Sequence, residues 1–378
     1  FYDSIFFNVP HLRFPEFTEE WETKPINDLA VVIGGGTPDT TVKSYWDGEI
    51  QWFTPSEIGK TKYVDSSLRT ITEDGLNNSS AKRLPPNTIL LSSRATIGEC
   101  SLSLRECATN QGFQSLVSKK CNVDFLYYLI QTKKNDLIRK SCGSTFLEIS
   151  ANEVRKIQVS IPSDVEQQKI AGLLSLIDER IATQNKIIED LKKLKSAIRK
   201  RRFSLLKDEH TESFEINQLL TYEQPTPYIV ANDEYSKDTT LIPVLTANKG
   251  FILGYTDEDF GVYQKGECII FDDFTMDAKY VSFPFKVKSS AIKILTAKPC
   301  VNLRFMFEYL SYLELKSEEH KRHYISEIAS LVIEVPSLKR QNKIAFLMTS
   351  LDNKLTLEEN AKLRYEDKKQ YLLSQMFI

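Results

Sequence analysis

The chain has 378 residues, of which 41% are hydrophobic and 26% are charged, and its formal net charge at pH 7 is −2. These values are typical of a globular protein and exclude a disordered one, and the length favours two domains over a single core. No apolar run approaches the roughly 20 residues that a membrane-spanning helix needs. Because the net charge is so small, any binding to nucleic acid must come from local basic patches.

The first residues, FYDSIFF, contain no basic segment and no small-residue cleavage site, so we expect no signal peptide. The chain opens at Phe1 without an initiator methionine, so we expect native residues to precede it. The six cysteines form no Cys-x-x-Cys pair. We expect them to be reduced thiols of a cytoplasmic protein.

Short strands and helices are predicted for residues 1–162. The segment PPNTILLSSRATIG (85–98) has a turn, a short apolar strand and a polar loop, and ATNQGFQSLVSK (108–119) is predicted to contain another strand. An amphipathic helix is predicted for FLYYLIQTKKNDLIRK (125–140). Strands mixed with short helices indicate an α+β module of about 150 residues.

A long charged helix is predicted for residues 163–207. The strand KIQVSIPS ends at a proline, and Ser163 with Glu166 is typical of a capping box. Apolar residues then recur at the two core positions of a seven-residue repeat, which is typical of a helix that packs along another helix. They are Ile170, Ile177, Leu191 and Ile198 at the first position, and Leu174, Ile181 and Ile188 at the second.

The module and the helix are then repeated, over residues 208–336 and 337–378. QKGECIIFDDFTMD (264–277), KSSAIKILTAK (288–298) and NLRFMFEYLSYLEL (302–315) follow one another in the same order as the three elements of the first module. The second helix has the same heptad pattern. Its core positions are Ile344, Leu351, Tyr365 and Leu372 at the first, and Met348 and Leu355 at the second.

The two helices match at a constant offset of 174 residues, which pairs Asp178 with Asp352 and Lys195 with Lys369. Polar residues interrupt both apolar repeats at matching positions, where they would fix the register. A helix of about 40 residues is about 60 Å long. An antiparallel intramolecular pair related by a rough two-fold axis fits this pattern best, and the alternative is a helix that packs on the core of its own domain.

Six motifs in this order resemble the specificity subunits of type I restriction–modification enzymes, and the resemblance covers essentially the whole chain. It implies an α+β fold with two similar target-recognition domains, separated by a pair of long antiparallel coiled-coil helices with pseudo-two-fold symmetry. The motifs are RFPEF (13–17) with Trp21, GGGTP (34–38), LLSSRATIGE (90–99), NQGFQ (110–114), GSTFLEIS (143–150) and IPSDVEQQKIAGLLSLID (161–178).

The family's function implies a DNA-recognition subunit that is not catalytic by itself. Each domain recognises one half of a bipartite site in double-stranded DNA, and the helix pair sets the gap and docks two methyltransferase subunits. Restriction subunits join through these, and S-adenosylmethionine, ATP and Mg²⁺ are expected in the partner subunits. We expect a cytoplasmic protein without a membrane anchor. The alternative is a non-catalytic adaptor that binds proteins through two modules on a coiled-coil rod.

Candidate DNA contacts are polar side chains in predicted loops, because base edges are distinguished best by Arg, Asn and Gln. Arg94 is the first candidate for a base contact, and Ser92, Ser93 and Thr96 are expected to contact phosphates. An ordinary surface turn is the alternative for each candidate. The full set is Thr37, Thr54, Ser92, Ser93, Arg94, Thr96, Asn110, Gln111, Ser144, Thr145, Asn248, Lys249 and Lys279.

Charge is distributed unevenly along the chain. Residues 165–207 have eleven Lys or Arg and five Asp or Glu, whereas residues 210–335 have twelve and nineteen. The basic run KKLKSAIRKRRF (192–203) is either a solvated helix face or a contact for phosphates or a partner. Because phosphate contacts give much of the affinity for DNA, we expect the subunit alone to bind DNA weakly.

Catalytic motifs are incomplete. SEIGKTK ends like an ATP-binding loop but has Thr54 where the first glycine is required. Neither an S-adenosylmethionine loop nor the catalytic tetrapeptide of an amino-methyltransferase is found, and we predict no metal site. Asp272, Asp273 and Asp277 are predicted to lie in a solvated loop and not to bind a metal for nuclease chemistry.

Overall fold

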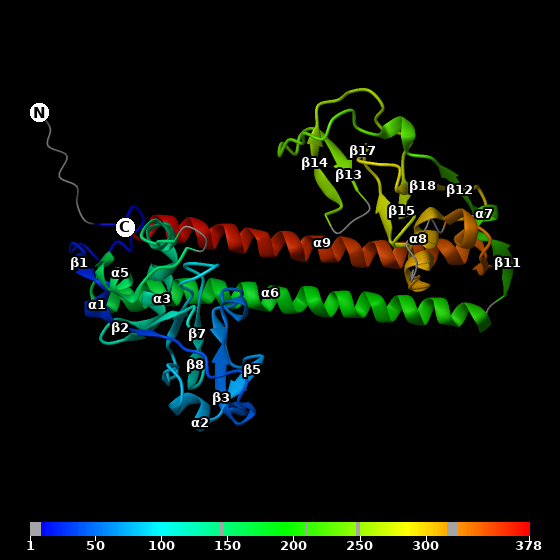
Figure 1. Cartoon of the computed structure of the whole chain (residues 1–378). Helices are drawn as coiled ribbons and strands as arrows, with labels where there is room; N and C mark the ends of the chain where they lie inside the picture. Colours follow the sequence, from blue (N-terminus) through cyan, green and yellow to red (C-terminus); the bar gives the residue numbers. More distant parts are fainter. Residues whose placement is uncertain (1–8, 144–146, 209, 247–249, 316–323) are drawn as a thin grey trace, which may run out of the picture. The chain divides into compact units, whose positions relative to one another are not determined.

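The computed structural model describes residues 9–143, 147–208, 210–246, 250–315 and 324–378. The chain divides into two compact units: unit 1 is Phe1–Lys186 with Asn360–Ile378, and unit 2 is Ile187–Glu359 (Figure 1). Both long helices have residues in each unit, so each unit holds one sheet-containing module and a segment of both helices. The four-part division at residues 162, 207 and 336 stays a prediction, and the compact units divide the chain differently.

Unit 1 contains two main sheets and a separate strand pair. Its strands are β1 (Glu22–Pro25), β2 (Ala30–Gly34), β3 (Trp46–Phe53), β4 (Tyr63–Val64), β5 (Arg69–Ile71), β6 (Ile89–Leu91), β7 (Cys100–Ser103), β8 (Cys107–Thr109), β9 (Gln114–Ser118) and β10 (Gln158–Ile161). The sheet orders are β2-β9-β6-β7-β4 and β5-β3-β8, and β1 pairs antiparallel with β10. Strand β6 lies inside its sheet, and all three of its residues are buried, as its continuous apolar run predicts.

Short helices cover unit 1 and join its sheets to the long helix. They are α1 (Ile26–Leu29), α2 (Glu73–Asn77), α3 (Val123–Thr132), α4 (Lys134–Arg139) and α5 (Ala151–Lys156), and α6 (Asp164–Ser204) begins in this unit. The single helix predicted for residues 125–140 is wrong, because it is broken between α3 and α4. The N–H of Lys133 bonds to the carbonyl of Ile130 at 3.1 Å, and this tighter turn ends α3.

Unit 2 repeats the topology of unit 1. Its sheet order β12-β18-β15-β16 corresponds to β2-β9-β6-β7, its order β14-β13-β17 corresponds to β5-β3-β8, and β11 pairs with β19 as β1 pairs with β10. The predicted repeat of one α+β module is therefore confirmed. The strands are β11 (Thr211–Glu215), β12 (Leu220–Glu223), β13 (Ile242–Leu245), β14 (Ile252–Thr256), β15 (Cys268–Asp272), β16 (Ala278–Val281), β17 (Lys286–Val287), β18 (Ile292–Ala297) and β19 (Val332–Pro336).

The helices of unit 2 also have counterparts in unit 1. They are α7 (Ile216–Leu219), α8 (Leu303–Tyr312) and a short π-helix (Tyr324–Ile328), and α9 (Leu338–Gln375) begins in this unit. The side chain of Asn302 caps α8 by accepting the N–H of Phe305 at 2.9 Å, as Asn122 caps α3 through Phe125 at the same distance. No helix in the described part of the chain combines the length and the hydrophobicity that a membrane crossing requires.

Segments of the two long helices pack together inside each unit (Figure 1). In unit 1, Leu174 of α6 and Leu372 of α9 belong to one core with Phe125 of α3. In unit 2, Ile344 of α9 lies in a core with Phe305 of α8. Each helix segment therefore packs both on its own module and on the other helix. The sequence offered these two kinds of packing as alternatives, and the structure contains both. The heptad residues are buried (Ile170, Leu174, Ile177, Ile188, Ile344, Met348, Leu355, Leu372) or half-buried (Ile181, Leu191, Ile198, Leu351, Tyr365).

Ion pairs occupy the polar interruptions of the helix contact. In unit 1, Asp178 of α6 pairs with Lys369 of α9 at 2.8 Å, and in unit 2 Lys195 of α6 pairs with Asp352 of α9. The offset of 174 residues converts one pair into the other. The partners of both pairs show that the helices run antiparallel, and polar side chains fix the register, as predicted.

A buried glutamine connects the start of each long helix to its module. Gln167 donates to the carbonyl of Pro162 at 2.9 Å and accepts the N–H of Asn122 at 3.0 Å. Gln341 makes the same two bonds, to Pro336 at 2.9 Å and from Asn302 at 2.8 Å. The helix, the strand before it and the cap of α3 or α8 are therefore held at one point in each unit.

Arg13 makes a further contact at the start of α6. Its guanidinium donates two hydrogen bonds to the carboxylate of Glu166, at 2.7 and 2.8 Å, and Glu166 is buried. The carboxylate that the sequence suggested as a capping partner therefore holds the RFPEF motif against the helix.

Truncation of Leu174 tests the core that joins α6 to unit 1. Leu174 is 0% exposed and Leu176, on the same helix, is 60% exposed. We expect Leu174→Ala to lower the free energy of unfolding by about 3 kcal/mol, because it leaves a cavity in a packed core. Leu176→Ala is the matched control and should change the free energy of unfolding by less than about 0.5 kcal/mol. Urea denaturation measures both, and equal effects would contradict the packing described.

Candidate nucleic-acid interface

Loops that follow β2, β3, β6 and β8 meet in unit 1. The N–H of Asn110 bonds to the carbonyl of Phe53 at 3.1 Å. The N–H of Gly36 bonds to the carbonyl of Thr109 at 2.8 Å. The N–H of Ser93 bonds to the carbonyl of Gly112 at 2.8 Å. These bonds bring together residues 35–41, 54–58, 92–98 and 110–113, which we call the unit 1 loop cluster.

The glycines of GGGTP permit a close approach between two of these loops. A Cβ atom on Gly35 would lie 2.0 Å from the carbonyl oxygen of Asn110, and one on Gly36 would lie 2.2 Å from Oγ of Ser80. Neither distance is possible for a real side chain, so both positions require glycine. Gly35 therefore serves packing within the cluster, and Gly36 serves the packing of the cluster against Ser80.

Three of the predicted residues lie together at the surface of the cluster. The hydroxyl of Thr37 donates to Oε1 of Gln111 at 2.5 Å, and both side chains are exposed. Asn110 is half-buried, and its Oδ1 accepts the N–H of Gly112 at 2.9 Å. The cluster therefore presents carboxamide and hydroxyl groups, which can donate to and accept from the edges of bases.

Arg94 is in the same cluster but already has a partner. Its guanidinium lies 2.8 Å from a carboxylate oxygen of Glu148, and the two side chains are 43% and 36% exposed. To contact a base, Arg94 must either bind the base and Glu148 at the same time or lose its ion pair with Glu148. Sequence reasoning missed Glu148, because the two residues are far apart in the chain and meet only in the folded unit.

Three hydroxyl residues have structural roles. Ser92 and Ser93 are 0% exposed, so the prediction that their side chains contact phosphates is wrong for this structure. They are buried because the β6 strand continues as a bridge from Ser92 to Phe113. Thr54 is half-buried and forms a capping box with Glu57, whose carboxylate accepts its hydroxyl at 2.6 Å.

Of the six remaining predicted residues, two are among the described residues and four are not. Thr96 is exposed, and its hydroxyl donates to Oγ of Ser92 at 3.1 Å. Lys279 is half-buried and lies 4.0 Å from Asp277. The other four predicted residues lie outside the described residues: Ser144, Thr145, Asn248 and Lys249.

The acidic residues after β15 are part of the structure of unit 2. Asp272 and Asp273 are buried, so the prediction of a solvated loop is wrong for both, although Asp277 is exposed. Asp273 accepts the N–H of Tyr324 at 2.8 Å and lies 3.4 Å from the ammonium of Lys293. The described residues include no group of three or more His, Cys, Asp or Glu that could hold a metal ion.

The basic run at the end of α6 forms ion pairs inside unit 2. Lys192 pairs with Glu359 at 2.9 Å and Lys200 pairs with Glu314 at 3.0 Å, at exposed positions. Lys195 and Arg199 both contact Glu308, whose side chain is fully buried. Part of the run is therefore a solvated face, and part of it neutralises an internal carboxylate.

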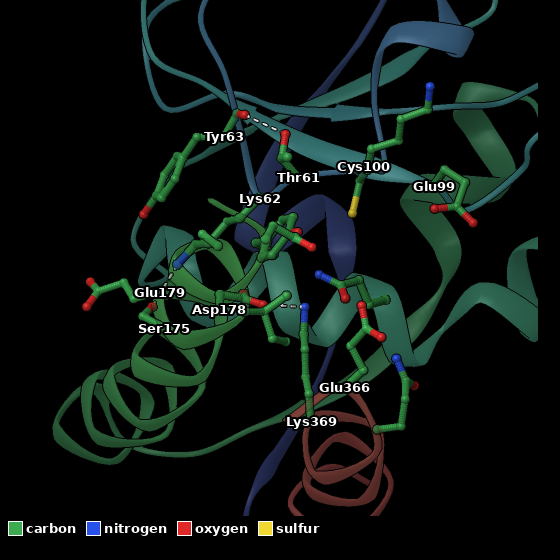
Figure 2. Close-up of a pocket in the computed structure, with 18 residues that line it drawn as sticks. Thr61, Lys62, Tyr63, Glu99, Cys100, Ser175, Asp178, Glu179, Glu366 and Lys369 are labelled. Atoms are coloured by element: carbon green, nitrogen blue, oxygen red, sulfur yellow. Dashed lines mark hydrogen bonds and ion pairs between the residues drawn. The ribbon is translucent and has the colours of Figure 1, made fainter. Parts of the chain in front are cut away.

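A pocket of about 580 Å³ in unit 1 lies between the loop before β4, α3 and the two long helices (Figure 2). Three charged groups that line it, Lys62, Asp178 and Lys369, each have a partner of opposite charge. Lys62 contacts Asp124 at 2.6 Å and Ser175 at 2.7 Å, and Asp178 contacts Lys369 at 2.8 Å. Burial raises the pKa of Cys100 to about 12, so its thiol is protonated and is a poor nucleophile at neutral pH. The pocket lies where the module packs against both long helices.

Comparison with known proteins identifies the family. A family model described as type I restriction modification DNA specificity domain matches residues 18–193 and again residues 208–365. The type I restriction enzyme MjaIX specificity subunit of Methanocaldococcus jannaschii is 37% identical over 212 residues, which cover 55% of this chain and 49% of that protein. The EcoR124I/EcoR124II specificity subunit of Escherichia coli is 40% identical over 185 residues, which cover 44% of each chain. The chain thus spans about half the length of these two relatives.

A solved structure shares the fold. The S subunit of a type I restriction–modification system from M. genitalium aligns with a TM-score of 0.64 at 17% identity, covering 98% of this chain and 99% of that one.

Substitution of Gly35 tests the packing of the cluster. A Cβ atom at this position would collide with backbone, so we expect Gly35→Ala to lower the free energy of unfolding by about 1–3 kcal/mol. A Cβ atom on Gly172 in α6 would have no neighbour within 4 Å, and Gly172→Ala should raise the same free energy by about 0.5–1 kcal/mol. Thermal denaturation of both variants measures the contrast, and a tolerated Gly35→Ala would contradict the close approach.

Proposed function

The chain belongs to the type I restriction modification DNA specificity family, and on this premise we propose that it is the DNA-recognition subunit of a type I restriction–modification complex. One observation supports this most: a single module topology occurs twice, and polar side chains are displayed on a loop cluster in unit 1. A scaffold that is repeated while its loops differ suits the recognition of two different sequences.

Each unit, in this proposal, recognises one half of a bipartite site in double-stranded DNA. The strand orders of the two units agree, but the residues after β6 and β15 differ in kind. Arg94 pairs with Glu148 at the surface of unit 1, whereas Asp273 pairs with Lys293 in the interior of unit 2. Different side chains on equal scaffolds are what two unlike half-sites require.

The two long helices, we further propose, set the gap between the half-sites and dock two methyltransferase subunits. Their outer faces support this, because large apolar side chains are exposed there: Leu176 is 60%, Leu357 is 64% and Phe346 is 76% exposed. Exposed apolar side chains on helices that are already paired are available for a contact with another protein. Restriction subunits would join through the methyltransferase subunits.

Chemistry in this proposal belongs to the partners. They would bind S-adenosylmethionine, ATP and Mg²⁺, methylate adenine and cleave DNA, and this chain would choose the site in the cytoplasm. The charge of the chain supports dependence on partners, because most of the basic run in α6 is already paired with carboxylates of unit 2. Few cations are left for phosphates, so the subunit alone would bind DNA weakly.

The adaptor alternative is supported by the same exposed apolar residues, since they favour protein partners whether or not DNA is bound. A mobility shift assay with the methyltransferase partner and duplexes of random sequence separates the two functions. A DNA-recognition subunit enriches particular sequences. An adaptor gives a complex without sequence selectivity even at low salt.

Removal of Arg94 tests the modular recognition of half-sites. We expect Arg94→Ala to relax specificity at one half-site only, by about tenfold or more at one base position, as the loss of a base contact predicts. Arg105 in unit 1 is an exposed arginine paired with Asp65 at 2.7 Å, and Arg105→Ala is the matched control. Sequencing of methylated sites in cells that carry the complete system measures the preference. Loss of both half-sites together would contradict separate recognition by the two units.

Insertion of one heptad into both helices tests their role as a spacer. Seven residues between Lys186 and Ile187 and seven between Glu359 and Asn360, at the boundaries of the units, keep the apolar repeat in register. They add about 10 Å of helix, or about three base-pair steps of ~3.4 Å. The methylated sites should keep both half-sites and gain about three base pairs between them. The control, an insertion in α6 alone, should destabilise the protein, and an unchanged gap would contradict the spacer.

A further inference from the structure

The loop before β18 in unit 2 has the same local structure as the loop before β9 in unit 1. In unit 1, Oδ1 of Asn110 accepts the N–H of Gly112 at 2.9 Å. In unit 2, Oγ of Ser289 accepts the N–H of Ala291 at 3.4 Å. Both are turns in which a side-chain oxygen bonds to the backbone two residues later.

Two backbone bonds confirm that these loops are equivalent. The carbonyl of Gly112 accepts the N–H of Ser93, and the carbonyl of Ala291 accepts the N–H of Asp273, at 2.8 and 3.0 Å. On the other side, the N–H of Lys288 bonds to the carbonyl of Leu245 at 2.9 Å, at the end of β13. The corresponding bond in unit 1 comes from the loop cluster to the end of β3. Residues 288–291 therefore occupy the place of residues 110–112, and the loop in unit 2 is one residue longer.

Lys288 differs from most of the other described cations of the unit 2 module. Its side chain is exposed, and its backbone bond to the end of β13 gives it the place that half-buried Asn110 has in unit 1. Among the described residues of the module, Lys288 and Lys237 are exposed without an ion-pair partner, and of these two only Lys288 lies in the loop before β18. Six other cations of the unit 2 module each contact a carboxylate or a carbonyl oxygen: Lys265, Lys279, Lys286, Lys293, Lys298 and Arg304.

The loop is held in place from the interior of the unit. Asp273, which bonds to Ala291 through its N–H, is buried and lies 3.4 Å from the buried ammonium of Lys293. Its carboxylate also accepts the N–H of Tyr324 at 2.8 Å. A buried, fully engaged ion pair under an exposed turn gives a preorganised surface, as specific recognition requires.

We propose that Lys288, Ser289 and Ser290 form the loop through which unit 2 contacts DNA, with Lys288 bound to a phosphate and Ser290 directed to a base edge. This rests on the proposed function and assigns residues to the second half-site. A hydroxyl can donate to or accept from a base, and an ammonium supplies a positive charge that offsets the acidic composition of the unit at this loop. The chemistry differs from that of Asn110 and Gln111, so the two units recognise different sequences.

The test uses the full chain in complex with its methyltransferase partner, and a pool of DNA duplexes of random sequence. Lys288→Ala should weaken binding about five- to tenfold on all sequences and lower the salt dependence by about one phosphate contact. Ser290→Ala should relax the preference about tenfold at one base position of one half-site. Ser290→Thr, which keeps the hydroxyl, should retain that preference. Thermal denaturation verifies that each variant is folded.

Two controls separate this inference from the proposed function. Lys298→Ala removes a lysine at the opposite end of β18 and should leave affinity and preference unchanged. Gln111→Ala should alter only the other half-site. If it does so while folded Lys288→Ala and Ser290→Ala variants behave like the unaltered chain, the loop assignment is overturned and the proposed function stands. Absence of any sequence preference in the unaltered complex overturns both.

Discussion

The structure depends on one contact that each unit makes between the two long helices. Asp178 meets Lys369 in unit 1, and Asp352 meets Lys195 in unit 2. The helix sequence is repeated, and each ion pair joins one residue of α6 to one residue of α9. An aspartate and a lysine at matching positions of each helix are therefore enough to form both pairs. Only an antiparallel pair allows this exchange, since a parallel pair would place equal charges side by side. The repeat and the direction of the helices are therefore one constraint.

Around this shared contact the two units have diverged. In unit 1, Asp178 also accepts the hydroxyl of Tyr128 at 2.6 Å. In unit 2, the equivalent site on α8 is occupied by Glu308, which is fully buried and contacts Lys195, Arg199 and Arg304. A buried carboxylate is stable only while its cations remain, whereas a neutral phenol has no such requirement. Each module is thus matched to its own helix segment, and a module moved onto the other segment would leave charges unpaired.

Sequence reasoning predicted what depends on periodicity and failed where distant residues meet. The heptads and the offset of 174 residues predicted the helices, because a buried helix face repeats regularly in the chain. The repeated module was predictable for the same reason. Ser93 was expected to contact phosphates because it follows a short apolar strand. A bridge between Ser92 and Phe113 extends that strand, and Ser93 is buried. Asp273 was expected to be solvated, but it is buried in the folded unit. Its contacts there are with Lys293 and Tyr324, which lie far along the chain and cannot be recognised from the local sequence.

Composition was the least reliable guide to the candidate interface. The acidic excess of residues 210–335, taken alone, argues against contact with DNA in the second module. Two of its carboxylates, Glu308 and Glu314, instead face the basic run of α6 and neutralise it within unit 2. These opposite charges cancel locally and contribute little to the field at the loops, given a Debye length of about 8 Å at physiological salt. What decides phosphate binding is whether a cation such as Lys288 is exposed and unpaired, and only the folded unit shows that.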